Sequence, residues 1–329
     1  MKRTALLLIS LSLGLPAAAS AGEGFDIVAV GARGGIEDGN LSAYMIAPHG
    51  DPRAVMCDVG ALVNGLRVAD EKGAFDSVTV PADSDYTRVG HVLTQQIKGY
   101  LISHAHLDHL AGMIAASPDD SKKPIYALPS VTADIEQTYF NWEAWPNFGN
   151  RGKEPQLKKY DYRDLPVGQK VELAETGMSV TAFPLSHGGV ESTAFLIESG
   201  DDALLCFGDT GPDEIEKSTA IADIWAAVAD KVRDRKLKAV IIEVSYTNAQ
   251  PDNLLFGHLT PAWLLKSLKG LEEQAGAGSL KDLPVVISHI KYSLKKGALP
   301  QEEILGELTA GNDLGVNFII PEQGMKWQF

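Results

Sequence analysis

Residues 104–109, His-Ala-His-Leu-Asp-His, decide the fold of this chain. Three imidazoles and one carboxylate follow an apolar run that predicts a buried strand, and they precede an apolar segment that can begin a helix. His104 and His106 alternate along an extended backbone and can converge on one ion. Asp108 and His109 lie farther round the turn and can face a second ion. The stretch is therefore predicted to be a metal-binding strand-to-helix turn.

The donor atoms in this turn indicate the kind of metal. Imidazole nitrogens and carboxylate oxygens without thiolates suit zinc or a similar borderline divalent ion. The alternative is a loop that carries three solvated histidines. Three later residues favour the metal site, because each follows a predicted strand: His187, Asp209 and His289. Each alone would be an ordinary loop residue, but their strand-end positions and their order along the chain indicate metal ligands when the turn is also considered.

Residues 104–118, His-Ala-His-Leu-Asp-His-Leu-Ala-Gly-Met-Ile-Ala-Ala-Ser-Pro, resemble the signature of the class II 3′,5′-cyclic-nucleotide phosphodiesterases, which belong to the metallo-β-lactamase superfamily. The resemblance extends over most of the chain after residue 25. Ala115 stands where the pattern has a larger aliphatic residue, which is a packing difference away from the metal ligands. The resemblance implies an α/β fold, the αββα sandwich, with the active site at one edge of the sandwich.

The resemblance also implies how the donors are used. One metal ion is held by His104, His106 and His187, the other by Asp108, His109 and His289, and Asp209 bridges the two. The two divalent ions are expected to be zinc. A hydroxide shared between the two ions would be the expected nucleophile toward phosphorus. Its attack would open a 3′,5′-cyclic nucleotide, cAMP or cGMP, to the 5′-monophosphate.

The leaving 3′-oxygen needs a proton, and two residues outside the seven metal donors are candidates to supply it. Glu243 lies in the segment Val240–Tyr246, and His258 lies in Gly257–Thr260. This arrangement is similar to the glutamate and histidine motifs of the superfamily's tRNA 3′-processing nucleases. The resemblance implies that Glu243 orients His258 and that protonated His258 donates to the leaving group. Alternatively, Glu243 is a strand-end carboxylate and His258 a capping or packing residue. With Asp108, the pair forms the predicted catalytic set.

Residues 1–21 predict an export signal. Lys2 and Arg3 form a basic start, an apolar stretch follows, and Ala19-Ser20-Ala21 forms a small-residue cleavage site with the cut after the last of these residues. We expect one catalytic domain, residues 22–329, located in the periplasm or secreted, with no membrane association after cleavage. The alternative is a retained membrane anchor.

The charge of the chain narrows the class of substrate. Without Lys2 and Arg3, the 29 basic residues fall to 27 against 43 acidic ones, and the net charge changes from −14 to −16. Nucleic-acid binding normally needs a basic surface, so we expect no nucleic-acid partner. A small cyclic nucleotide remains a suitable substrate, because metal ions in a cleft can bind a small anion locally.

The rest of the chain is organised as strands with helices between and after them. Thr219–Arg235 is predicted to be a helix, and a second begins at Thr260 and Pro261. Residues 133–164, rich in aromatic side chains, are expected to form an insertion near the cleft, with a surface flap as the alternative. The predicted strands are Phe25–Val30, Ala43–Ala47, Ala54–Val59, Gln96–Ser103, Ile125–Leu128, Met178–Pro184, Ala194–Glu198, Ala203–Phe207, Ala239–Val244, Val285–Ser288 and Val316–Ile320.

Two cysteines, Cys57 and Cys206, lie in apolar strands. We expect two buried free thiols, because free cysteine is among the most buried residue types. Export would permit a disulfide between them. Asp58, which follows the first of these cysteines, is expected to be a supporting or turn residue rather than a ligand.

Five residues are weaker candidates for contacts to the substrate. Asn141, Trp142 and Asn147 could stack on a purine or hydrogen-bond to it. Asn40 follows the first strand, where a loop could approach phosphate. Tyr292 lies just after a predicted metal ligand and could reach the cleft.

Three other functions are considered for the same residues. A lactone or ester hydrolase has less need of a dedicated acid, because a metal-stabilised carboxylate leaves without one. Another phosphodiesterase, such as a tRNA-processing nuclease, shares the Glu243–His258 arrangement but conflicts with the export signal and the acidic charge. A non-catalytic zinc-binding protein needs no proton donor. The predicted Glu243–His258 pair therefore favours phosphodiester hydrolysis.

Overall fold

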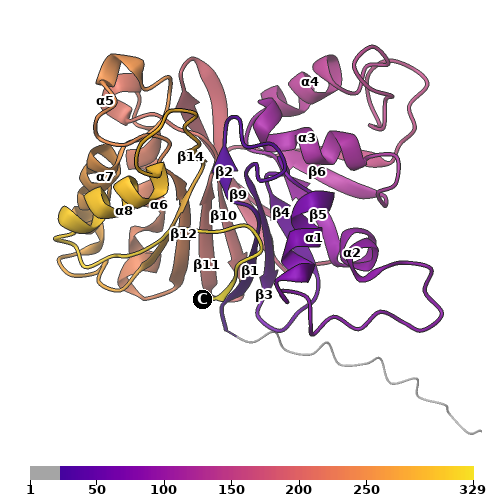
Figure 1. The fold of residues 1–329 in the computed structure, drawn as a ribbon, viewed down its shortest axis with the longest axis horizontal. Helices are drawn as coiled ribbons and strands as arrows, with labels where there is room; N and C mark the ends of the chain where they lie inside the picture. The colour runs from indigo at the N-terminus through magenta and orange to yellow at the C-terminus, as the bar shows by residue number, and fades with distance from the viewer. Residues whose placement is uncertain (1–22) are drawn as a thin grey trace, which may run out of the picture.

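The computed structural model describes residues 23–329, so the predicted export signal lies outside the described residues. Two seven-stranded sheets stack face to face, and helices cover the outer face of each sheet (Figure 1). This arrangement confirms the predicted αββα sandwich. Within residues 23–329, no helix has the length and apolar character needed to cross a membrane.

The first sheet is formed mainly by the N-terminal half of the chain. Helices α1 (Val63–Glu71), α2 (Arg88–His91), α3 (Leu107–Ala116) and α4 (Pro129–Thr138) accompany it. Its strands, in spatial order, are β16 (Lys326–Gln328), β1 (Phe25–Gly31), β3 (Ala43–Pro48), β4 (Ala54–Cys57), β5 (Ile97–Leu101), β6 (Lys123–Ala127) and β7 (Tyr160–Asp164).

The second sheet is formed by the C-terminal half. Helices α5 (Asp213–Glu216), α6 (Ala220–Arg233), α7 (Pro261–Ala275) and α8 (Pro300–Ala310) lie on its side of the molecule. Its strands, in spatial order, are β15 (Asn317–Ile319), β13 (Pro284–Ser288), β12 (Leu237–Glu243), β11 (Asp202–Phe207), β10 (Val190–Ser199), β9 (Ser179–His187) and β8 (Lys170–Glu172). A short parallel pair, β2 (Arg33–Gly34) with β14 (Ile290–Lys291), joins the two halves.

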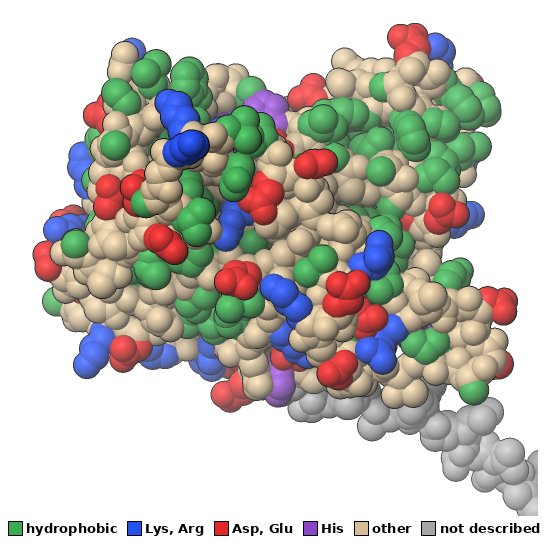
Figure 2. Space-filling view, viewed as in Figure 1, with side chains coloured by type: hydrophobic (Ala, Val, Ile, Leu, Met, Phe, Trp, Pro, Cys, Tyr) green, Lys and Arg blue, Asp and Glu red, His purple; other side chains and the backbone are tan. Residues whose placement is uncertain are grey.

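The strand directions place the residues that follow several strands at one edge of the sandwich. Strands β4 to β7 run parallel in the first sheet, and β11, β12, β13 and β15 run parallel in the second. Since the carboxyl ends of parallel strands meet at one edge, residues that follow these strands lie together. In the space-filling view, a histidine is visible at this edge, in the notch between the two halves (Figure 2).

All eleven predicted strands are present, and the predicted helices correspond to α6 and α7. The short strands β2, β7, β8, β14 and β16 were not predicted, because β2 and β14 have only two residues each and the other three contain exposed positions that interrupt an apolar pattern. The expected insertion, residues 133–164, begins inside α4 and ends with β7, so its irregular part is residues 139–159. Its role beside the cleft stays a prediction.

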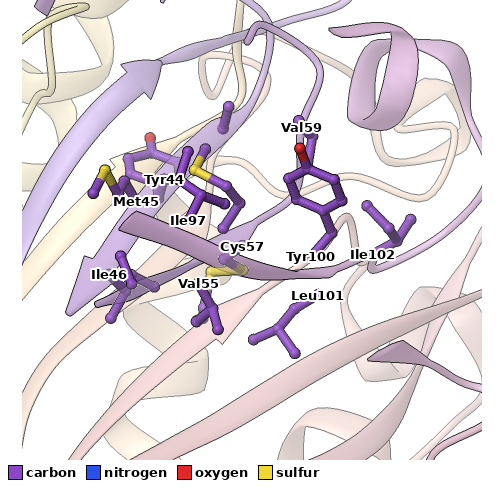
Figure 3. Close-up of a cluster of buried hydrophobic side chains, with 14 of the residues drawn as sticks. Tyr44, Met45, Ile46, Val55, Cys57, Val59, Ile97, Tyr100, Leu101 and Ile102 are labelled. Atoms are coloured by element: carbon purple, nitrogen blue, oxygen red, sulfur yellow. A yellow bond between two sulfur atoms is a disulfide. The ribbon is translucent and has the colours of Figure 1, made fainter. Parts of the chain in front are cut away.

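The expectation of two free cysteines is wrong, because Cys57 and Cys206 form a disulfide. Cys57 ends β4 in one sheet and Cys206 lies on β11 in the other, with 6.8 Å between their Cα atoms. The bond crosses the apolar layer between the sheets, among residues such as Val55 and Leu101 (Figure 3). The sequence shows that both strands are apolar, but it does not show that these two side chains face each other.

Candidate metal centre and proton-donor pair

All seven predicted metal donors meet at the edge where the strands end. His104 and His106 follow β5, Asp108 and His109 occupy the first turn of α3, and His187 is the last residue of β9. Asp209 follows β11, and His289 separates β13 from β14. Each half of the sandwich therefore supplies part of the cluster, and neither half holds it alone.

The first group of donors consists of His104, His106 and His187, whose ring nitrogens lie within 4.8 Å of one another. Nδ1 of His106 lies 3.3 Å from Nε2 of His187. Nδ1 of His187 donates to the carbonyl oxygen of Gly257 at 2.7 Å, and Nδ1 of His104 donates to the hydroxyl of Ser103 at 3.0 Å. These bonds leave both Nε2 lone pairs free to face a metal ion.

The second group consists of Asp108, His109 and His289. Oδ2 of Asp108 lies 3.1 Å from Nε2 of His289. Nδ1 of His109 donates to Asp58 at 2.7 Å, and Nδ1 of His289 donates to the hydroxyl of Ser245 at 2.9 Å. As in the first group, the outer ring nitrogens are engaged and the inner ones face a common point.

Asp209 lies between the two groups and is almost completely buried. Its Oδ2 is 3.2 Å from Nε2 of both His109 and His289, and 3.8 to 3.9 Å from Nε2 of His187 and His104. One carboxylate oxygen therefore approaches donors of both groups, which is the arrangement expected of a bridging ligand.

The electrostatics of the cluster favour bound cations. Burial and the adjacent His109 lower the pKa of His104, which keeps that ring in the neutral form that binds metals. Burial opposes ionisation of Asp209, yet the rings of His109 and His289 hold its pKa well below the usual range. Burial also opposes protonation of His109, but Asp209 and Asp58 raise its pKa well above the ordinary value. The carboxylates thus stabilise positive charge at this point.

The residues present fit divalent metal ions. Nε2 of His104 and Nε2 of His109 are buried and have no hydrogen-bond partner among the described residues. Buried polar atoms are normally satisfied, so two such atoms aimed at a carboxylate indicate a missing positive partner. Imidazole and carboxylate donors suit zinc and similar ions. The cluster can therefore hold metal.

Asp58 supports this cluster from behind, as expected of a supporting residue. Its φ of +53° places it in the left-handed region, at the turn that directly follows β4. The two carboxylate oxygens accept from the backbone N–H and the hydroxyl of Ser103, each at 2.8 Å, and one also accepts from His109. This network fixes the orientation of a donor in each metal group.

Glu243 and His258 form a buried pair beside the cluster. Oε1 of Glu243 lies 2.8 Å from Nδ1 of His258, and the same oxygen accepts from the backbone N–H of Thr210 at 3.0 Å. Burial opposes protonation of His258, but the Glu243 carboxylate raises its pKa above the ordinary value. The ring of His258 lies 4.7 Å from that of His187 and 5.2 Å from that of His289, measured between centroids. A protonatable ring is thus held against both metal groups.

His258 is also near enough to His187 and Asp209 to act as a metal donor. Its Nδ1, however, is engaged by Glu243, and this same nitrogen is the one that lies 3.7 Å from Asp209. The pairing therefore favours the interpretation of His258 as a proton donor, which stays a prediction.

Three of the five predicted substrate contacts use their amides within their own loops. Asn40 accepts from the backbone N–H of Ala32, and Asn141 accepts from the backbone N–H groups of Glu143 and Ala144. Asn147 is fully buried and bonds to backbone groups of its own loop. The remaining two are partly exposed: Trp142 donates to the carbonyl oxygen of Pro155, and Tyr292 lines a cavity beside Ser245.

Three contributors to the site were missed. Ser245 contacts Glu243, His258 and His289 at once. Gly35 donates its backbone N–H to Asp108 at 2.8 Å, and Gly34 packs against the ring of His289. The two adjacent glycines are visible in the sequence, but the sequence does not show that they lie against Asp108 and His289.

Comparison with known proteins agrees with this geometry. The family model for class II cAMP phosphodiesterases matches residues 30–324. A 3′,5′-cyclic-nucleotide phosphodiesterase of Aliivibrio fischeri is 56% identical over 306 residues, which cover 93% of each chain. A probable 3′,5′-cyclic-nucleotide phosphodiesterase of Yersinia pestis is 44% identical and covers 100% of this chain and 95% of its own length. The crystal structure of unliganded yeast PDE1 shares the fold, with a TM-score of 0.81, 23% identity and coverage of 94% of this chain and 100% of its own. The chain belongs to the class II cAMP phosphodiesterase family.

Proposed function

We propose that this chain is an exported hydrolase that opens 3′,5′-cyclic nucleotides, cAMP or cGMP, to 5′-monophosphates at a centre of two zinc ions. The observation that carries the proposal is the meeting of seven metal-binding side chains with the Glu243–His258 pair at one edge of the sandwich. The names of relatives that span most or all of the chain support the substrate class.

The donors divide into two groups that suit two ions. His104, His106 and His187 would hold one ion, Asp108, His109 and His289 the other, and Asp209 would bridge them. The ions would supply a nucleophile from water near neutral pH and positive charge beside the phosphoryl oxygens. The aspartates offset only part of that charge, so a phosphodiester anion is attracted to an otherwise acidic protein.

The chain's own acid completes the reaction. Cleavage releases the 3′-oxygen of the ribose as a strongly basic alkoxide. Protonated His258, oriented by Glu243, would donate a proton to this oxygen as the bond to phosphorus breaks. A carboxylate leaving group would need no such donor, which is why the pair favours phosphodiesters over lactones.

Two features support export. Residues 1–21 have the pattern of a secretory signal, with a cut after Ala21. The Cys57–Cys206 disulfide suits an oxidising compartment, because disulfides persist in secreted and periplasmic proteins and are rare in the cytosol.

A substrate panel tests the proposed activity. Mature, zinc-loaded protein beginning at residue 22 is incubated with cAMP, cGMP, a tRNA precursor and a set of lactones under matched conditions. We expect 5′-AMP or 5′-GMP as the product and little cleavage of the polyanionic RNA. Lactone turnover far above that of both cyclic nucleotides would contradict the proposal.

Metal content tests the proposed centre. Wild-type protein should bind two divalent ions per chain. Asp209→Ala should lose both, because that carboxylate approaches both groups, whereas His187→Ala should mainly weaken one. One ion in the wild type, or two retained in Asp209→Ala, would contradict the bridging role.

A further inference from the structure

A cavity opens beside the proton-donor pair, and its lining includes Ser245, which contacts both members of that pair. It lies between the loop that follows β12, the loop that follows β14 and the start of α8. Its volume is about 650 Å³, and its lining includes Tyr246, Lys291, Tyr292 and Leu294. An aromatic and basic lining of this size suits a flat, anionic organic molecule rather than a bare ion.

The position of His258 determines which part of a substrate can reach this cavity. A general acid must lie within hydrogen-bond reach of the atom it protonates. In a 3′,5′-cyclic nucleotide that atom is the ribose 3′-oxygen, so the ribose must lie on the His258 side of the phosphate. The ring of Tyr246 stands edge-on to His258, with 5.7 Å between centroids, and Ser245 contacts His258 and also lines the cavity. The cavity therefore begins where the ribose has to lie.

The charges that line the cavity match an anionic ligand. Lys291, Lys295 and Lys296 line it, and none of the three pairs with a carboxylate in the part of the chain that the structure describes. Glu303 is the acidic residue of the lining. The whole chain carries a net charge of −14, so these lysines form a locally basic cluster on an otherwise acidic protein.

Two tyrosines give the cavity its aromatic surfaces. Nζ of Lys291 donates to the hydroxyl of Tyr246 at 3.3 Å and fixes that ring beside His258. Tyr292 is 49% exposed and forms no side-chain hydrogen bond with the described residues, so its ring face is available for stacking. Stacking of a base on an aromatic ring is sequence-tolerant and strong.

We propose that this cavity is the nucleoside subsite, with Tyr246 beside the ribose and Tyr292 stacked on the base. The inference rests on the proposed function and adds to it the residues that recognise the nucleoside. It also distinguishes the two aromatic candidates for contact with the base, Tyr292 and Trp142. Trp142 lies in the irregular segment beside α3 and α4, on the other half of the sandwich, so the base should contact Tyr292 and not Trp142.

The test compares substrates with and without a nucleoside. Tyr292→Ala, Tyr292→Phe and Trp142→Ala are assayed with cAMP and with methyl 4-nitrophenyl phosphate, a diester that has no nucleoside. We expect Tyr292→Ala to lower kcat/KM for cAMP by roughly tenfold to a hundredfold, the usual range for loss of one base stack, and to leave the small diester unchanged. Tyr292→Phe keeps the ring and should restore cAMP hydrolysis.

Product inhibition gives a second measurement. Tyr292→Ala should raise the inhibition constant of 5′-AMP by a similar factor and leave that of inorganic phosphate unchanged. Tyr86→Ala is the matched control. Tyr86 is also 49% exposed, but it lies just before α2 in the N-terminal half and does not line this cavity. It should change neither constant.

Three results would overturn the inference in distinguishable ways. An equal loss on both diesters in Tyr292→Ala would mean that Tyr292 supports the loop rather than the base. A cAMP-specific loss in Trp142→Ala without one in Tyr292→Ala would place the base on the opposite half. Wild-type protein that leaves both cyclic nucleotides intact would instead overturn the proposed function, and the subsite with it.

Discussion

One serine hydroxyl connects the candidate proton donor to a candidate metal ligand. Nδ1 of His289 donates to the hydroxyl of Ser245, which donates to Oε2 of Glu243 at 2.7 Å. The other oxygen of Glu243 accepts from Nδ1 of His258. Each link has one donor and one acceptor, so the chain fixes the tautomer of both histidines. Ser245 is therefore a positioning residue for both functions of the site.

Removal of this hydroxyl should affect metal binding as well as rate. Ser245→Ala leaves Nδ1 of His289 without its acceptor, so affinity for the second ion should fall about tenfold to a hundredfold, as for other partners of metal ligands. Titration with zinc and a chelator measures this affinity, and Ser245→Thr, which keeps the hydroxyl, is the control. Unchanged zinc affinity in Ser245→Ala would mean that the serine positions only the Glu243–His258 pair and not His289.

The leaving group provides the sharpest test of His258. His258→Ala should keep both metal ions yet lose about two to four orders of magnitude in cAMP hydrolysis, the usual contribution of a positioned acid. A nitrophenyl phosphodiester releases a stable phenolate and should lose much less. Glu243→Gln should show the same pattern more mildly. Equal losses on both substrates would mean that His258 binds phosphate or supports structure.

The same pair predicts a dependence on pH. An acid catalyst is active while protonated, so cAMP hydrolysis should decline as the pH rises through the pKa of His258, which Glu243 raises. Glu243→Gln removes that influence, so the decline should begin at lower pH. Profiles of kcat/KM against pH for the wild type and this variant test the shift, and coincident profiles would contradict it.

At the scale of elements, the shortest strands have the largest effect on the site. The pair β2–β14 holds Gly34 directly against the ring of His289, where a Cβ atom would lie 2.3 to 2.4 Å from three ring atoms. The residue has no room for a side chain, and His289 itself has a φ of +55° that allows little adjustment. A two-stranded element thus sets the position of one candidate metal ligand.

Gly34→Ala should therefore displace His289. Overpacking of this kind costs about 1–3 kcal/mol, which a chain of this size can tolerate, so the variant should fold. It should nevertheless bind the second ion more weakly and hydrolyse cAMP more slowly. Gly270→Ala in α7 has open space and is the control. Normal zinc content in Gly34→Ala would show that β2 moves to accommodate the methyl group and that His289 keeps its position.

These elements also show what sequence alone can predict. Buried strands such as β5 and β12 are visible as mainly apolar segments, and residues at their ends can be assigned to one edge once the fold is known. Strand β2 has two residues and pairs with β14 more than 250 positions later, so no local pattern marks it. The role of Ser245 likewise depends on distances to Glu243, His258 and His289, which come from different parts of the chain, so no local pattern marks it.

At the scale of the whole molecule, each candidate metal group needs both halves of the sandwich. The first group combines His104 and His106 with His187, and the second combines Asp108 and His109 with His289. A small shift between the sheets would separate the donors in both groups. The Cys57–Cys206 disulfide crosses the layer between the sheets, and Asp58 and Asp209 follow its two cysteines within three residues. The covalent link therefore lies directly behind the centre.

Loss of this disulfide should destabilise the protein and loosen the centre together. A double variant, Cys57→Ala with Cys206→Ala, should lose about 2–4 kcal/mol of unfolding free energy, because the bond closes a loop across 149 positions. Since donors from both sheets would then move more independently, zinc should also dissociate faster. Urea unfolding of the zinc-free forms and zinc release to a chelator measure the two effects separately. Reductant should convert the wild type to the behaviour of the double variant and leave the double variant unchanged. A destabilised variant that releases zinc at the wild-type rate would show that packing between the sheets holds the donors without the bond.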